Sequence, residues 1–195
     1  MRELSLNVKD VKEIAEKLDF KIILDGGSLL GAYRDNGPIK NDEDDIDFAV
    51  PFEVMQFKAL DIVKEFQARG FELYRLRDTV MTFKRNGSKI DFLFYKEDEF
   101  YIRSLDHTEI NNTKSEGYFY YLTLYHNKKP FALKVPCEYW NNLGTIEFLG
   151  EKFLCPEKIE HYLVWRFGDD WRTPILRPAF GFKNYLENKK LTTFL

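Results

Sequence analysis

The sequence has few cysteines and no long hydrophobic segment. Its 195 residues include two cysteines, Cys137 and Cys155, which are too few for a disulfide framework and lack metal-ligand spacing. Both lie beside prolines in apolar surroundings, so we interpret them as two buried thiols. No apolar run approaches the roughly 20 residues that cross a bilayer, and the charged N-terminal segment is unlike a secretion signal. We therefore expect a cytoplasmic protein without a transmembrane segment.

An excess of positive charge is also lacking. The chain has 29 lysines and arginines against 32 acidic residues, which gives a net charge of −3. Surfaces that bind a nucleic acid polymer normally have a basic excess, so we expect no such partner, although a single nucleotide is not excluded. Repeats, low-complexity tracts and linkers rich in glycine or serine are missing too, which favours one domain over two.

The hydrophobic periodicity predicts a mixed α/β (α+β) fold, with helices flanking a mixed sheet. Helices are expected near the N-terminus, from about residue 52 to Ala68, and from Pro156 as first helical position to Phe167. Gly70 is expected to end the second of these helices, and the Asn86–Ser88 turn predicts a hairpin. We expect one domain over residues 1–195, with a core in about 1–105 and a β-rich and helical extension in about 106–195. Strands are expected at 20–24, 46–50, 71–76, 79–85, 89–95, 99–104, 118–125, 130–135, 145–149 and 152–154.

Acidic residues gather before and within the second predicted strand. Asp45 and Asp47 are two residues apart, so a strand would project both carboxylates from the same face, about 6.6–6.8 Å apart along the chain. Five carboxylates within residues 42–47 repel one another, and divalent cations would relieve that repulsion. Asp91 lies among hydrophobic residues of a later strand and would need a partner there. If the two strands are neighbours, the three aspartates can share Mg²⁺ or Mn²⁺ ions, two of them about 3.5–4 Å apart.

A glycine-serine turn, Gly26, Gly27 and Ser28, lies between a predicted strand and a predicted helix. Free amides at a helix N-terminus form a cradle for a pyrophosphate or triphosphate, and a glycine leaves them unobstructed. The Ser28 hydroxyl can also donate a hydrogen bond. The turn alone is a weak signal, but its combination with the Asp pair and a later strand Asp is a specific three-part pattern.

These residues carry a resemblance to a known family. The segment LDGGSLLGAYRDNGPIKNDEDDIDFAV, residues 24–50, resembles the signature of the LicD/fukutin family within the nucleotidyltransferase superfamily. A second match, YLVWRFGDDWRTP at residues 162–174, is similar to the family's later Leu, Tyr-Gly, Trp and Pro pattern. The two matches bracket most of the chain.

The resemblance implies a nucleotidyltransferase-like fold and a metal-dependent transfer reaction. It implies that a phospho-alcohol group, such as phosphocholine or ribitol phosphate, moves from a CDP-linked donor to a glycan. By the same resemblance Asp45 and Asp47 match the metal-binding pair, and Asp91 matches the later strand aspartate. Gly27 and Ser28 match the phosphate turn, and Arg34 matches an arginine that commonly follows it.

Less specific interpretations stay open for several of these residues. The acidic run could be a solvated loop, and Asp91 could be a buried salt-bridge partner. Ser28 could be a helix N-cap, and Arg34 could neutralise the acidic loop instead of binding a donor phosphate. For the GDDW segment at residues 168–171 we favour a structural role that ends the helix over a catalytic one.

Two other functions also stay open. One is a nucleotidyltransferase that uses an NTP and attaches a nucleotide monophosphate to a small molecule or protein. The other is a non-catalytic nucleotide-binding module. The three carboxylates favour an enzyme, in which Asp91 is the expected general base and the transfer depends mainly on positioning and charge neutralisation.

Overall fold

The computed structural model describes residues 2–40, 42–77, 80–97, 102–103, 109–110, 118–126, 129–174 and 191–193. Helices and strands alternate as far as α3, and most of the later described residues are in strands. The helices are α1 (Arg2–Lys17), α2 (Gly26–Arg34), α3 (Phe52–Ala68), α4 (Cys137–Asn141) and α5 (Ile159–Phe167). The strands are β1 (Ile23–Leu24), β2 (Asp45–Pro51), β3 (Glu72–Arg77), β4 (Val80–Arg85), β5 (Ser88–Glu97), β6 (Ile102–Arg103), β7 (Glu109–Ile110), β8 (Tyr118–His126), β9 (Lys129–Pro136), β10 (Leu143–Phe148), β11 (Glu151–Pro156) and β12 (Leu191–Thr193).

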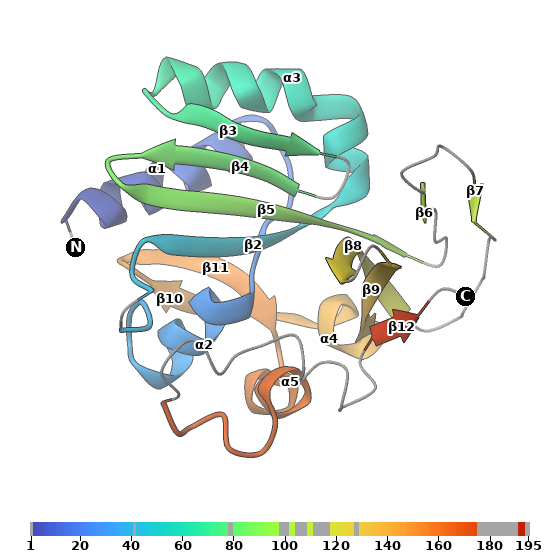
Figure 1. The fold of residues 1–195 in the computed structure, drawn as a ribbon. Helices are drawn as coiled ribbons and strands as arrows, with labels where there is room; N and C mark the ends of the chain where they lie inside the picture. The colour runs from blue at the N-terminus through green and yellow to red at the C-terminus, as the bar shows by residue number, and fades with distance from the viewer. Residues whose placement is uncertain are drawn as a thin grey trace.

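The described strands form a ten-stranded mixed sheet and a separate pair, β6 with β7. In the ten-stranded sheet the strands follow the order β10, β11, β1, β2, β5, β8, β9 and β12. In addition, β4 pairs with β5 and β3 pairs with β4. β2 and β5 are parallel, as are β1 and β11, and the other pairs are antiparallel. The long strand β5 therefore lies beside β2 and β4 over its first part and beside β8 at its end (Figure 1).

One face of the sheet is packed with aromatic rings. Phe48 of β2 and Phe92 of β5 are fully buried, and their ring centroids are 6.0 Å apart. Phe66 of α3 stacks on Phe83 of β4 at 4.0 Å and meets Phe92 edge to face at 5.6 Å. Because side chains alternate along a strand, residues 45, 47, 89 and 91 project from the opposite face.

The helices cover the two faces separately. α1 and α3 contact each other and lie on the aromatic side, whereas α2 contacts β2 and α5 on the other side (Figure 1). The N-terminus of α2 thereby comes to the face from which residues 45, 47 and 91 project. This arrangement creates the candidate site.

Several local predictions are confirmed. The hairpin between β4 and β5 turns at Asn86 and Gly87, whose φ angles are 51° and 78°, and α3 is followed by Gly70 at φ 80°. Positive φ at both central turn residues suits a two-residue hairpin, and positive φ after a helix suits glycine. The β10–β11 hairpin is also present.

Other local predictions are wrong in detail. Pro156 ends β11 instead of opening α5, which begins at Ile159, because residues 151–156 pair in register with β10. β1 covers Ile23 and Leu24 of the five residues expected. Cys155 is buried as expected, but Cys137 is half-buried at the start of α4.

The central sheet contains strands from both the predicted core and the predicted C-terminal extension. β11 lies directly beside β1, with Ile23 opposite Leu154, so strands beyond residue 142 complete the sheet around the N-terminal core. The single-domain assignment for residues 1–195 stays a prediction.

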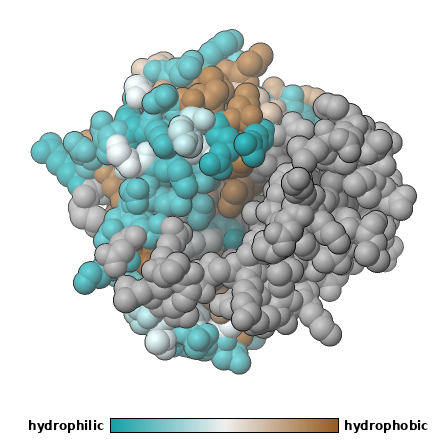
Figure 2. All heavy atoms as spheres, viewed as in Figure 1, coloured by the Kyte–Doolittle hydropathy of each residue, from teal (hydrophilic) through white to brown (hydrophobic). Residues whose placement is uncertain are grey.

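The outer surface is mostly hydrophilic on the side of the described residues seen in Figure 2, with brown hydrophobic atoms over α3 at the top. Phe57 and Leu60 of α3 are 79% and 74% exposed. No described helix is both long and apolar enough to span a membrane.

Candidate active site

The parallel pairing of β2 and β5 brings the three predicted aspartates together. Asp47 lies opposite Asp91, and Asp45 lies opposite Lys89 two residues earlier. One carboxylate oxygen from each of Asp45, Asp47 and Asp91 lies within 4.8 Å of the others. The arrangement on which the metal prediction depends is therefore present.

The acidic run divides into two parts. Glu43 and Asp44 are exposed, as expected of a solvated loop. Asp45 and Asp47 are half-buried on β2, and Asp91 is 7% exposed on β5. The loop interpretation thus fits Glu43 and Asp44, and metal binding by the aspartates on the two strands stays a prediction.

Three other carboxylates surround Asp47. The pKa of its carboxyl is raised from 3.8 to about 8, first by burial and then by the charges of Asp45, Asp91 and Asp25, while Arg166 opposes the rise. Crowded carboxylates disfavour one another's ionisation. A cation bound beside these carboxylates would favour their ionised forms and so lower the raised pKa.

Two buried oxygens point to the same conclusion. Asp45 Oδ1 and Asp91 Oδ1 have no hydrogen-bond partner among the residues that the structure describes. A buried carboxylate oxygen without a partner is costly. Together with Asp47 these atoms are a hard-oxygen donor set of the kind that Mg²⁺ and Mn²⁺ prefer. The cluster therefore fits a divalent ion.

Sequence reasoning overlooked Lys89. Its ammonium lies 2.9 Å from Asp45 Oδ2 and 3.3 Å from Asp91 Oδ2. A signal was available, because Lys89 precedes Asp91 by two residues and must share its face of β5. Lys84 lies opposite Lys89 on β4, but it places its ammonium 3.4 Å from the centre of the Tyr74 ring, on the β3 side.

The glycine-serine turn contacts the same carboxylates. Gly26 begins α2 at φ 56°, and a Cβ at this position would lie 2.8 Å from Asp47 Oδ2. The backbone N–H of Asp25 donates to the Asp47 carbonyl at 3.2 Å. The backbone N–H of Asp47 donates to Ser28 Oγ at 2.9 Å. The start of α2, with Gly27 in its first turn, is thus held directly against Asp47.

The N-cap interpretation of Ser28 is wrong. Asp25 occupies the N-cap position, without a side-chain capping bond, and Ser28 lies inside the first turn. The 3%-exposed Ser28 accepts a hydrogen bond from β2 instead. The first helical backbone bond runs from Leu29 N–H to the Asp25 carbonyl, so the amides of residues 26–28 precede the helical ladder.

The other end of α2 holds the loop that leads to the acidic run. A Cβ on Gly31 would lie 2.5 Å from the Gly37 carbonyl oxygen and 2.9 Å from the Ile39 nitrogen. Only a glycine permits this approach, because both neighbours are backbone atoms. Gly31 thereby sets the path of the chain toward β2.

Arg34 lies in the last turn of α2, away from the glycine turn. Its Nε and Nη2 donate to the Asp35 carboxylate at 2.8 and 2.7 Å, and its Nη1 donates to the Trp171 carbonyl at 3.2 Å. Trp171 is buried, and its ring centroid lies 5.8 Å from that of Tyr33. These contacts support the structural role favoured for the GDDW segment, whose Gly168 follows α5 at φ 100°. Phosphate binding by Arg34 stays a prediction.

A buried carboxylate on α2's N-cap connects the site to α5. Asp25 is fully buried and accepts a hydrogen bond from the Tyr162 hydroxyl. Arg166 Nη2 lies 3.8 Å from Asp25 Oδ2, and the Arg166 side chain is 10% exposed. None of these three was predicted as a site residue from the sequence, although Tyr162 and Arg166 share a helix face at i, i+4 spacing.

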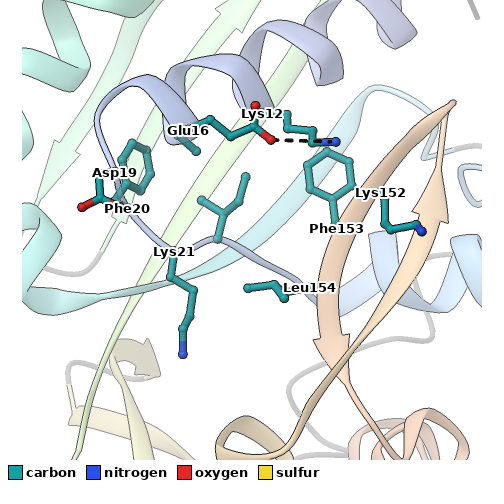
Figure 3. A pocket seen from close by; sticks show the side chains of 10 residues that line it. Lys12, Glu16, Asp19, Phe20, Lys21, Lys152, Phe153 and Leu154 are labelled. Atoms are coloured by element: carbon teal, nitrogen blue, oxygen red, sulfur yellow. Dashed lines mark ion pairs between the residues drawn. The ribbon is translucent and has the colours of Figure 1, made fainter.

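A hollow of about 410 Å³ lies elsewhere, between α1, the segment before β1, and β11. Phe20 and Phe153 lie on opposite sides of it, and Lys12 and Glu16 form an ion pair of 3.9 Å at its rim (Figure 3). None of the three clustered aspartates lines this hollow. It is separate from the candidate site.

Comparison with known families agrees with the geometry. The model of the LicD/FKTN/FKRP nucleotidyltransferase domain matches residues 19–158, which include the glycine turn and all three aspartates. The chain belongs to this family. The nucleotidyltransferase-like fold expected from the sequence is therefore confirmed. No curated protein matches the sequence significantly.

Similar solved structures have low sequence identity. The chain is 11% identical to ANT(2″)-Ia in complex with adenylyl-2″-tobramycin, with a TM-score of 0.48, covering 96% of this chain and 86% of that one. It is 13% identical to the lincomycin-bound lincosamide adenylyltransferase LnuA, with a TM-score of 0.45 and coverage of 92% and 90%.

Proposed function

We propose that this LicD-family member is a metal-dependent transferase that moves a phospho-alcohol group from a CDP-linked donor to a glycan hydroxyl. Phosphocholine and ribitol phosphate are the groups that family membership favours. The observation that carries the proposal is the cluster of Asp45, Asp47 and Asp91, packed against the N-terminus of α2. Such a cluster combines cation binding with a backbone anion site in one place.

The three aspartates would hold the metal, with Asp45 Oδ1 and Asp91 Oδ1 as the oxygens that lack other partners. When bound, Mg²⁺ or Mn²⁺ supplies positive charge to the donor's phosphates. The amides of Gly26, Gly27 and Ser28 would receive the phosphate oxygens next to it. Arg166 adds a positive charge on this side, since it affects Asp47 and lies beside Asp25.

The proposed transfer is a substitution at the donor phosphorus that carries the alcohol. The acceptor's hydroxyl oxygen forms a bond to that phosphorus, the bridging P–O bond breaks, and CMP leaves. The hydroxyl proton passes to a triad carboxylate, for which Asp91 is the proposed acceptor because it lies deepest between β2 and β4. Positioning and charge neutralisation would account for most of the rate, as in other phosphoryl transfers.

Product analysis tests the proposal. The purified chain is incubated with Mg²⁺, a glycan acceptor panel and labelled CDP-choline, CDP-ribitol, CTP or ATP. Release of CMP together with label on the acceptor supports phospho-alcohol transfer. A nucleotide monophosphate on the acceptor would overturn it in favour of nucleotidyl transfer, and absence of Mg²⁺-dependent nucleotide binding in calorimetry would favour a non-catalytic module.

Asp45→Asn tests the cluster in that assay, and Asp44→Asn is its matched control. Asp45→Asn keeps the size of the side chain but removes one charge from the cluster, so we expect turnover to fall at least about a hundredfold, since each 1.36 kcal/mol of lost transition-state stabilisation is tenfold. Asp44→Asn removes the same charge from an exposed neighbour and should keep activity. Equal activity of the two variants would exclude the cluster as the catalytic centre.

A further inference from the structure

The oxygens of Asp45 and Asp91 divide into two groups. Both Oδ2 atoms contact the Lys89 ammonium, at 2.9 and 3.3 Å. Both Oδ1 atoms are buried and have no hydrogen-bond partner in the described part of the chain. One side of each carboxylate is thus neutralised by the protein itself, and the other side is left for a ligand.

The backbone holds Lys89 at this position. It lies opposite Asp45 in the β2–β5 ladder, and its N–H donates to the Asp44 carbonyl at 2.6 Å. Its side chain is 28% exposed, against 19% for Asp45 and 10% for Asp91, so the ammonium lies at the open edge of the cluster. An ammonium on a side chain of this length can bridge two carboxylates much as a metal ion does, although it donates hydrogen bonds instead of accepting lone pairs.

A count of charges favours one ion over two. As metal ligands the three carboxylates are ionised and carry three negative charges, which one divalent cation and one ammonium neutralise together. A pair of ions about 3.5–4 Å apart would need bridging carboxylate oxygens, and Lys89 already contacts two of those that the cluster offers. A second divalent ion would also lie close to the ammonium and be repelled by it.

We propose that Lys89 takes the place of the second cation, so that the site binds a single divalent ion through Asp45 Oδ1, Asp47 and Asp91 Oδ1. This inference rests on the proposed metal-dependent function. It replaces the two-ion arrangement expected from the sequence with one ion and one built-in ammonium. In the transfer reaction the Lys89 ammonium then interacts directly with the negatively charged phosphates of the donor.

Counting bound Mn²⁺ tests the proposal without an activity measurement. Calorimetry and the electron paramagnetic resonance signal of free Mn²⁺ give the number of ions per chain, and spin coupling between ions reveals a close pair. We expect one uncoupled ion in the wild type and two coupled ions in Lys89→Met. Asp45→Asn should weaken binding at least tenfold, which identifies the cluster as the site.

Lys84→Met is the matched control. Lys84 lies opposite Lys89 on β4 but contacts the Tyr74 ring, so its removal takes away the same charge from the next strand. We expect one ion in Lys84→Met and one in Lys89→Arg, which keeps the charge.

Two coupled ions in the wild type, or one ion in a folded Lys89→Met, would overturn the role of Lys89 and leave the proposed function standing. Absence of Mn²⁺ binding in every variant would overturn both. If Lys89→Met does not fold, the number of ions bound to the wild type still decides between a one-ion and a two-ion site.

Discussion

Replacing Asp47 by Asn should stabilise the metal-free protein while removing its response to metal. In the folded chain burial and then the charges of Asp45, Asp91 and Asp25 raise the Asp47 pKa to about 8, from 3.8. The folded state therefore binds a proton that the unfolded state releases between these two values. Without metal, stability should fall as pH rises from about 4 to about 8, and change little above that range.

The size of the effect follows from the pKa difference. One pKa unit corresponds to about 1.36 kcal/mol. At pH 7 the raised Asp47 pKa can therefore lower the free energy of unfolding by at most about 4 kcal/mol. Because Asp47 is only half-buried, solvent screens part of this interaction, and we expect about 2 kcal/mol. Asn keeps the shape and removes the charge, so Asp47→Asn should exceed the wild type by about this amount at pH 7 and by little at pH 4.

Urea denaturation in EDTA at pH 4, 5.5, 7 and 8.5 measures the difference between the two proteins. Adding Mg²⁺ to a hundred times its dissociation constant should then stabilise the wild type by about 2.7 kcal/mol and the variant far less. Asp44→Asn, an exposed change in the same run, should follow the wild type throughout. If Asp47→Asn is less stable in EDTA at every pH, or its difference from the wild type does not vary with pH, the charge-crowding argument is wrong.

Three further predictions concern two residues at the start of α2 and one buried thiol of β11. Gly26→Ala should destabilise the fold by about 2 kcal/mol in urea and abolish transfer, because alanine at φ 56° is strained and its Cβ meets Asp47 Oδ2; a fully active variant would contradict this. Ser28→Ala should cost about 1–3 kcal/mol by calorimetric melting, since the Asp47 amide loses its acceptor; Ser28→Thr, which keeps the hydroxyl, should retain more of the stability. Burial raises the Cys155 pKa to about 11 from 9.0, so iodoacetamide at pH 8 should label it about a hundredfold more slowly in native than in unfolded protein, as peptide mass mapping would show; equal rates would refute the burial.

The elements that the sequence predicted well depend on local chemistry. Gly70 follows α3 because a left-handed residue there suits glycine, and the Asn86–Gly87 turn suits two residues with positive φ. Asp45 and Asp47 share a face because strand side chains alternate. In each case neighbours along the chain supply the physical cause, so no long-range contact is needed to infer it.

The errors occurred where a distant segment competes with the local signal. Pro156 suits a first helical position, yet residues 151–156 extend a hairpin with β10, and pairing along six residues outweighs the preference of one proline. Ser28 resembles an N-cap, but the buried Asp47 amide needs an acceptor and Ser28 is the hydroxyl beside it.

The sequence by itself determined which residues carry the chemistry: three aspartates, a glycine turn and the same-face pair on one strand. Tertiary structure decided which charges these residues meet. The parallel pairing of β2 with β5 places Lys89 between Asp45 and Asp91, and the packing of α5 places Arg166 beside Asp25. Strand register and helix docking depend on burying the aromatic face between β2, β5 and α3, a sum over contacts far apart in the chain that no short motif contains.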